Sequence, residues 1–419
     1  MSFFPCAHAG HPVWQHATNQ VVAQLQAQIS MQKLQARTSL GVVYLSASYA
    51  EQAQAIVGLL SQALPRVQHW VGCATPAVLA GDTDYGATGA LAVMLPCVPA
   101  AQYQVFSGIT PWHTASLEPF TALVHGDART PNLARHVQAL QQHMDAAALV
   151  GGVCDLGAYP AQWAWGANTL ARTPASMGGG GVQQGGLSGV AFAQSVDCMA
   201  LSVQGCQPVG GAYTVTQVDG DVVLALDGRP ALEVVRSDEH WSPMLAPHGQ
   251  LAPPVDTLFQ PMAVMAQPPA CAVASAGRRR AQVMPVVGVD FLRQGLVLRG
   301  LPQLGSVLTL CQSDAPAMRA DLRRVCAELW ESLTTPDTES TSHTAGNGRS
   351  IAGAIFIRSQ HRHALRATAH VDEELQWIRH ALGPIPLLGF SSTCEVEAGA
   401  LQHESAQLLV FTQPLQALL

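Results

Sequence analysis

Residues 41–46 read Gly-Val-Val-Tyr-Leu-Ser, an apolar run of the right length for one buried strand. Ser48 and Glu51 follow with the spacing of a capping box, in which each side chain accepts a hydrogen bond from a free backbone N–H at the start of a helix. A second apolar run, residues 67–73, ends in Trp-Val-Gly-Cys. The stretch therefore predicts a strand–helix–strand unit whose second strand runs into a glycine, Gly72.

The same arrangement occurs twice more along the chain. Residues 120–152 contain two apolar runs around a helical stripe and end at Gly151 and Gly152. Residues 354–389 repeat the pattern, and their second run ends at Gly389. Because a helix that connects two neighbouring strands of one sheet joins parallel strands with a right-handed crossover, we expect three parallel pairs.

Other runs favour antiparallel hairpins. Residues 187–193 and 198–204 flank a short polar turn, and residues 213–218 and 222–226 flank Asp219-Gly220-Asp221. Parallel units mixed with hairpins predict an α/β fold of two domains, in which mixed β-sheets are flanked by helices as a layered α-β sandwich.

The domain organisation follows from changes in composition. We expect an N-terminal helical extension over residues 1–39 and a first domain over 40–236. Residues 237–283 contain many prolines without periodicity, which is typical of a linker. A second domain is expected over 284–412.

Composition excludes several classes of protein. The chain has 419 residues, of which 48% are hydrophobic and 12% charged, so a disordered chain is excluded. The formal net charge of −7 argues against a nucleic-acid partner, and the apolar runs are too short for a membrane helix of about 20 residues. The first residues lack a signal-peptide pattern, which leads us to expect a cytoplasmic protein.

No cofactor or metal is expected. The glycine run 178–181 lacks the Gly-Lys-Ser/Thr of a phosphate-binding loop and precedes a strand-like run. His361, His363 and His370 match no known spacing of metal ligands.

Several short motifs resemble, in the same order, those of FIST-domain proteins. They are residues 71–75, 150–152 and 204–232 for the N-terminal domain, and 285–289, 388–390 and His403 for the C-terminal domain. The resemblance implies paired domains that sense small molecules, with amino acids as the suggested ligands. The family usually carries a Cys-x-x-Arg-like turn and a Gly-Glu pair. This chain departs from both, because Ser359 stands in place of the Cys before Arg362 and Cys394 in place of the Gly before Glu395. No attached signalling segment is evident, so we expect a separate signalling protein as partner.

The three glycine-ended strands suggest where a ligand would bind, because ligands of open α/β sheets lie beyond the carboxyl ends of strands. If the turns converge, Arg362 could clamp a carboxylate, and Glu395 or Asp155 could pair with an ammonium. The predicted ligand-binding residues are Gly72, Cys73, Thr75, Gly151, Gly152, Asp155, Arg362, Gly389, Ser391, Cys394 and Glu395. The alternative is that the glycines only end strands and that Arg362 and Glu395 form a structural ion pair.

These observations predict a non-enzymatic cytoplasmic protein that binds or senses a small molecule, with an amino acid as the suggested ligand. Two alternatives stay open. One is an enzyme with Cys394 or Cys73 as nucleophile, since a nucleophile often occupies the turn just past a strand. The other is a protein-recruitment scaffold whose cleft holds a peptide.

Overall fold

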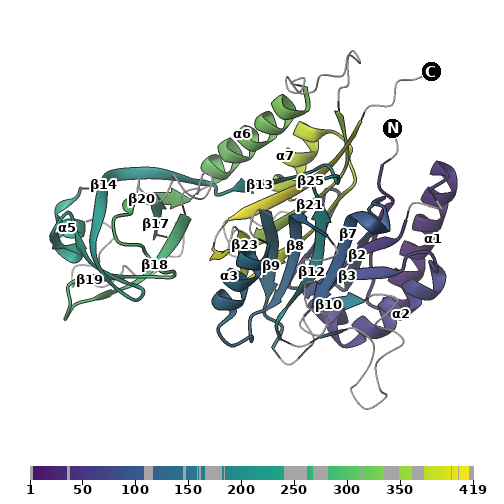
Figure 1. Ribbon diagram of the computed structural model, residues 1–419, viewed down its shortest axis with the longest axis horizontal. Helices are drawn as coiled ribbons and strands as arrows, with labels where there is room; N and C mark the ends of the chain where they lie inside the picture. Colours follow the sequence, from purple (N-terminus) through teal and green to yellow (C-terminus); the bar gives the residue numbers. More distant parts are fainter. Residues whose placement is uncertain are drawn as a thin grey trace.

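The structure is a computed structural model of the chain. It describes residues 3–34, 38–107, 117–144, 148–157, 159, 162–165, 182–183, 185–239, 262–267, 282–313, 315–334, 349–360, 372–397, 399–403 and 405–414. Three six-stranded sheets form the body of the molecule, and a fourth sheet forms a separate lobe at one side of it (Figure 1).

Sheet 1 carries the first strand–helix–strand unit. Its order is β1 (Cys6–Gly10), β6 (Ala90–Met94), β2 (Leu40–Ser46), β3 (His69–Thr75), β10 (Gln162–Trp165) and β11 (Val182–Gln183). Strands β2 and β3 are parallel, as the sequence predicts. All seven residues of β2 are buried because both faces of the sheet are covered.

Sheets 2 and 3 have the same arrangement of parallel and antiparallel strands as sheet 1. Sheet 2 consists of β7 (Tyr103–Ser107), β12 (Leu187–Ala193), β8 (Pro119–Asp127), β9 (Ala148–Cys154), β23 (Cys394–Glu397) and β24 (Ala400–Gln402). Sheet 3 consists of β13 (Cys198–Val203), β25 (Ala406–Pro414), β21 (Arg349–Ser359), β22 (Leu387–Ser392), β4 (Val78–Ala80) and β5 (Thr83–Asp84). The pairs β8–β9 and β21–β22 are parallel, which confirms the three predicted units.

Three consecutive modules of the chain therefore share one topology. We call them module 1 (β1 to β6), module 2 (β7 to β12) and module 3 (β13 to β25). In each module the strand after the parallel pair leaves its own sheet. Strand β4 follows β3 but pairs with β22, β10 follows β9 but pairs with β3, and β23 follows β22 but pairs with β9. The exchange is cyclic, so each sheet contains strands from two modules.

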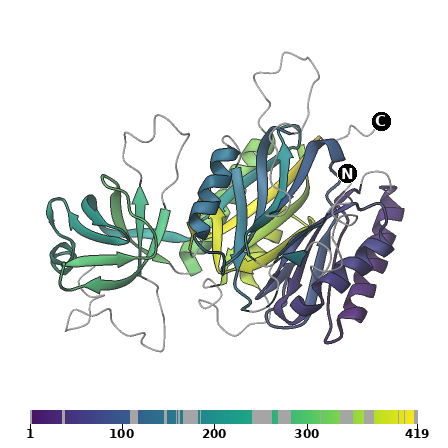
Figure 2. The same ribbon diagram turned by 60° about the horizontal axis from the view of Figure 1, so that its bottom comes forward.

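Helices cover the outer faces of the three sheets (Figures 1 and 2). They are α1 (Trp14–Gln32) and α2 (Ala53–Ala63) on sheet 1, α3 (Leu133–His143) on sheet 2, and α6 (Ala315–Thr334) and α7 (Glu373–Leu382) on sheet 3. The short 3-10 helices are η1 (Ala47–Gln52) and η2 (Ala100–Gln102).

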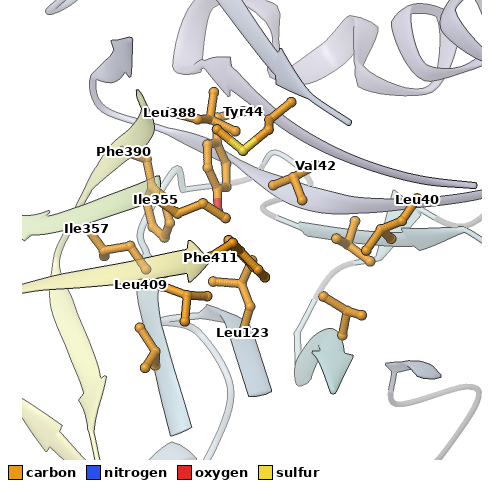
Figure 3. Close-up of a cluster of buried hydrophobic side chains, with 14 of the residues drawn as sticks. Leu40, Val42, Tyr44, Leu123, Ile355, Ile357, Leu388, Phe390, Leu409 and Phe411 are labelled. Atoms are coloured by element: carbon orange, nitrogen blue, oxygen red, sulfur yellow. The ribbon is translucent and has the colours of Figure 1, made fainter. Parts of the chain in front are cut away.

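The inner faces of all three sheets meet in one hydrophobic core. Val42, Leu123 and Ile355 come from the first strands of the three parallel pairs and belong to the same cluster of buried side chains. Figure 3 shows this cluster with Tyr44 and Phe390 among its members. The body is thus a single packing unit built around a shared centre.

The lobe is inserted into module 3 between β13 and α6. Its strands are β14 (Cys206–Asp219), β20 (Val307–Ser313), β17 (Met262–Gln267), β18 (Gln282–Asp290), β19 (Gly295–Leu298), β15 (Val222–Leu226) and β16 (Arg229–Pro230), followed in the chain after β16 by α5 (Ala231–Ser237). Since β14 pairs with both β20 and β15, the strands close into a small barrel around its own core.

Some local expectations differ from the structure. Residues 187–193 and 198–204 are not a hairpin, because β12 lies in sheet 2 and β13 in sheet 3; a turn signal is local and cannot reveal a change of sheet. The capping box is also wrong: Ala47–Gln52 is a 3-10 helix, and α2 begins after it without a side-chain cap. The hairpin around Gly220 is confirmed as β14–β15.

The segments interpreted as extension and linker contain sheet strands. Strand β1 lies within residues 1–39 and pairs with β6. Strand β17 lies within residues 237–283 and pairs with both β18 and β20 of the barrel.

Candidate functional site

Gly72, Gly151 and Gly389 occupy equivalent places in the three modules. They lie inside the second strands, which continue to Thr75, Cys154 and Ser392, so the prediction that each strand ends at its glycine is wrong. Each faces the carbonyl oxygen of the residue paired with it on the first strand. An added Cβ would lie 1.8 Å from Val43 O at Gly72, 2.0 Å from Val124 O at Gly151 and 2.1 Å from Phe356 O at Gly389. Glycine is needed here because the two strands approach too closely for any side chain.

The ends of the three second strands converge, which is the condition on which the predicted binding place depends. The hydroxyl of Thr75 on β3 donates to the carbonyl oxygen of Ser391 on β22 at 2.5 Å. The thiol of Cys154 on β9 donates to the same oxygen at 3.9 Å. Ser391 therefore links all three sheets where the parallel strand pairs reach their C-terminal ends.

Aromatic rings fill the interior next to this junction. The rings of Tyr44 and Phe390 lie 4.5 Å apart, and the ring of His125 lies 5.6 Å from Tyr44 and 5.8 Å from Phe390. An added Cβ at Gly152 would come within 2.8 Å of the Phe390 ring. The interior beside these strand glycines is thus packed with side chains.

Most of the predicted site residues lie in this buried region. The buried ones are Gly72, Cys73, Thr75, Gly151, Gly152, Gly389, Ser391, Cys394 and Glu395. Asp155 is exposed instead, and its carboxylate accepts a hydrogen bond from the Gly157 N–H at 3.1 Å. Arg362 lies outside the described residues.

The two candidate nucleophiles are poor ones. Burial raises the pKa of the Cys73 thiol well above its ordinary value. Burial, with a smaller contribution from Glu395, raises the pKa of Cys394 to about 12. Because the thiolate is the nucleophilic form, neither cysteine is activated for covalent catalysis.

The outer side of the junction holds a buried ionic cluster. Arg358, the penultimate residue of β21, donates from Nη2 to Asp84 Oδ2 at 2.6 Å and from Nη1 to Asp372 and to Glu374 Oε2, the latter at 3.4 Å. Its Nε lies 3.4 Å from the Ser391 hydroxyl. We call Arg358, Asp84, Asp372 and Glu374 the Arg358 cluster.

Charge pairing keeps this guanidinium ionised in spite of burial. Burial by itself lowers the pKa of Arg358, but Asp372, Glu374 and Asp84 raise it, and the net pKa is above the ordinary value. The side chain of Arg358 is fully buried. Charges removed from water interact more strongly than charges on the surface, so the cluster is a strongly polar site inside the fold.

Three different elements position the cluster. Arg358 comes from the end of β21, and Asp372 is the N-cap of α7, where its carboxylate accepts the Leu375 N–H at 3.1 Å. Asp84 comes from β5 of module 1, which the cyclic exchange places in sheet 3. The site therefore lies at the carboxyl end of a parallel pair and requires two modules.

Comparison of the modules shows that this site is a special feature of module 3. Leu45, Gly126 and Arg358 are equivalent. Each lies on the first strand of its parallel pair, two residues after the residue that pairs with the equivalent glycine of the second strand. Only Arg358 among these three is charged. The fold thus does not require an ionic group at this position.

A second buried carboxylate lies beside the cluster. Glu395 Oε1 is 2.6 Å from the hydroxyl of Ser392, which is also 3.1 Å from the carbonyl oxygen of Arg358. The hydroxyl of Ser405 donates to Glu395 Oε2 at 2.8 Å. Hydrogen bonds therefore connect Glu395, one of the predicted residues, to the strand that carries Arg358.

Sequence reasoning missed Arg358, Asp84, Asp372 and Glu374. The available signal was Arg358 itself, a charged residue directly after the buried run Ile355–Ile357. Asp84 gives no such signal, because its approach depends on a strand exchange between distant parts of the chain.

A small hollow elsewhere does not compete with this site. It lies near the C-terminal end of α7, has a volume of about 100 Å³, and is lined by residues that include Gly81, Arg379 and Gly383. Typical small-molecule pockets have volumes of about 300–1,000 Å³. Within the described part of the chain, no group of three or more His, Cys, Asp or Glu residues could hold a metal ion.

Comparison with known proteins identifies the family. The FIST N domain matches residues 39–229, and the FIST C domain matches residues 239–397. The chain belongs to the FIST family. FIST domains are generally sensory domains of signal transduction. In this FIST protein the Arg358 cluster joins the two matches, since Asp84 lies in the first and Arg358 in the second.

Two mycobacterial relatives are similar over part of their length. They are the uncharacterized protein Mb0898c of Mycobacterium bovis and the uncharacterized protein MT0897 of Mycobacterium tuberculosis, each 27% identical over 222 residues. The match covers 51% of this chain and 50% of each relative, so the chain spans about half the length of the curated relatives that it matches. Of the helices that the structure describes, none combines the length and apolarity that crossing a membrane requires.

Proposed function

We propose that this FIST protein is a non-enzymatic sensor that binds a small amino-acid-like metabolite beside the Arg358 cluster and signals through a separate partner. The observation that carries the proposal is the cluster itself, which brings a guanidinium and three carboxylates together at the carboxyl end of a parallel pair. A zwitterion carries both complementary charges.

The chemistry of the cluster matches the two ends of an amino acid. A guanidinium binds a carboxylate through two parallel N–H···O bonds, and a carboxylate accepts hydrogen bonds from an ammonium. Glu374 extends from the first turn of α7 and supplies a carboxylate. Arg362, the carboxylate clamp expected from the sequence, lies between Arg358 and Asp372 in the chain and remains part of the proposal.

Binding at this place would be transmitted between the two FIST domains. The cluster contains residues from both, so a ligand that alters its contacts changes how the domains hold one another. A ligand favours whichever arrangement it binds more tightly, and a partner that recognises this arrangement reads the signal. The raised pKa values of Cys73 and Cys394 favour this sensor over the cysteine enzyme.

A thermal-shift screen with the amino acids tests the proposal. A ligand that binds only the folded state raises the melting temperature. At a ligand concentration a hundred times Kd, it raises the free energy of unfolding by about 2.7 kcal/mol. We expect one chemical class of amino acid to shift the wild type. Glu374→Gln and Arg362→Ala should lose this shift, whereas Glu373→Gln, which alters the exposed neighbour of Glu374, should keep it.

Two results would contradict the proposal. The first is a wild-type protein whose melting temperature no amino acid alters. The second is a Glu374→Gln variant that responds as strongly as Glu373→Gln, because the binding place would then lie elsewhere.

A further inference from the structure

The three carboxylates around Arg358 are not held equally firmly. Asp372 is fully buried and also caps α7. Glu374 lies within the first turn of the same helix. Removing either from Arg358 would disturb a helix that packs on the core of sheet 3. These two carboxylates are therefore fixed parts of the site.

Asp84 lies on a much shorter element. It is the second residue of the two-residue strand β5, which is the edge strand of sheet 3 and pairs only with β4. Its side chain is 8% exposed, whereas that of Asp372 is 0% exposed. The side chain of Glu374 is 5% exposed, so Asp84 is only slightly nearer to solvent, but its place on a two-residue edge strand allows it to be withdrawn without disturbing a helix.

The contacts of Asp84 are those of a bound carboxylate. Oδ2 accepts from Arg358 Nη2 at 2.6 Å, and Oδ1 accepts from the Gly86 N–H at 2.8 Å. A free carboxylate could take over the Arg358 contact with the same geometry, because guanidinium and carboxylate groups match one another in shape.

We propose that Asp84 occupies, as an internal substitute, the place of the ligand's carboxylate at Arg358, and that binding exchanges one carboxylate for the other. This inference rests on the proposed sensor function for its biological meaning. The exchange involves no covalent step. It releases β5, the edge strand that the first FIST domain contributes to sheet 3, so occupancy of the site would alter the contact between the two domains.

Chemical rescue of the full chain tests this exchange without knowledge of the natural ligand. Asp84→Ala leaves a space of carboxylate size beside Arg358. We expect sodium acetate or sodium formate, compared with sodium chloride at equal ionic strength, to raise the melting temperature of Asp84→Ala by about 1–2 °C, the shift that about 1 kcal/mol produces in a chain of this size. Wild type should show no such anion-specific shift at these concentrations.

Asp82→Ala is the matched control. Asp82 lies two residues away, but its exposed carboxylate pairs with Arg379 on the surface of α7. It should therefore show no preference for acetate over chloride. Equal effects of the two anions on Asp84→Ala would overturn the proposal.

A second variant covers the case in which Asp84→Ala does not fold. Asp84→Asn keeps the shape of the side chain but removes the charge that competes for Arg358. The exchange predicts an apparent Kd for the responsive amino acid at least tenfold lower than in wild type, because the internal competitor is weakened. An unchanged or weaker affinity would refute the exchange, whereas failure of the proposed function would appear as a wild type without any amino-acid response.

Discussion

At the scale of single residues, the absence of a side chain decides whether the parallel pairs can close. At Gly151 the neighbouring carbonyl oxygen would be 2.0 Å from a Cβ, and this oxygen belongs to the backbone of Val124, which cannot rotate away. The sequence shows the three glycines clearly but not their role. In the sequence, a glycine after an apolar run equally fits a ligand-binding turn, and only the strand register shows that it lies inside a strand against a neighbouring backbone.

Gly151→Ala should therefore be strongly destabilising. The forced separation of β8 and β9 should lower the free energy of unfolding by about 3 kcal/mol, the upper part of the usual range for overpacking. Gly58→Ala is the control, because Gly58 lies inside α2 with no atom within 4 Å of an added Cβ. It should raise stability by about 0.5–1 kcal/mol through helix propensity. Urea denaturation measures both, and equal stabilities would disprove the close-approach argument.

A charged residue gives the protein part of its acid sensitivity. Burial raises the pKa of Asp127, but hydrogen bonds from Arg129 and from the Gly185 N–H lower it, and the net pKa is below the ordinary 3.8. A carboxyl with a depressed pKa in the folded state stabilises the fold above its unfolded pKa, and this contribution is lost as pH falls through the folded pKa.

We therefore expect Asp127→Asn to destabilise the protein at pH 6 and to approach wild-type stability as the pH falls below about 3.8. Unfolding measured across this range gives the comparison. If the free energies of unfolding of wild type and Asp127→Asn differ by the same amount from pH 6 to pH 3, Asp127 does not contribute to the acid sensitivity.

At the scale of elements, α7 links local helix capping to the buried ionic cluster. The Asp372 carboxylate both accepts the Leu375 N–H and pairs with Arg358. Asn is as good an N-cap as Asp, so Asp372→Asn separates the two roles. We expect this variant to lose up to about 3–5 kcal/mol of stability, since breaking a buried pair leaves an incompletely compensated charge.

Asp372→Ala should be less stable again by about 1 kcal/mol, because it also removes the cap. Differential scanning calorimetry of the two variants tests this order. If Asp372→Asn unfolds like wild type, the residue acts only as a cap and the cluster contributes no stability through it.

The sequence predicts the elements better than their partners. The apolar composition of residues 41–46 and 67–73 is enough to predict β2 and β3. Strand β4 has only three residues, Val78–Ala80, and its partner β22 lies about 300 positions further along the chain. Nothing local specifies such a pairing. The Arg358 cluster depends on it through Asp84, which explains why sequence reasoning reached Ser391 and Glu395 but not the ionic centre beside them.

At the scale of the whole molecule, the cyclic exchange joins the three modules into the three-sheet body, which we call the ring. Each sheet borrows two strands from another module, so no module can bury its core alone. The barrel is different, because it has its own hydrophobic cluster; the chain enters it through β14 and leaves it through β20. The sequence shows the three strand–helix–strand units, but the equivalence of the whole modules and the exchange of strands between them emerge only when the strand orders are compared.

The barrel should therefore be removable without loss of the ring. Gln207 and Gln312 are paired residues at the base of β14 and β20, so replacing residues 208–311 by Asn-Gly would close them with a tight two-residue turn. The hydrogen bonds from the Gln204 and Gly205 N–H groups to Asp321 remain in this variant and hold the base of the turn against α6. We expect a shortened chain that unfolds cooperatively, keeps its near-ultraviolet circular dichroism and keeps the amino-acid response, because the Arg358 cluster lies wholly in the ring. A shortened chain without a cooperative transition would show that the barrel is part of the folding unit, and one that folds but no longer responds would move the binding place toward the barrel.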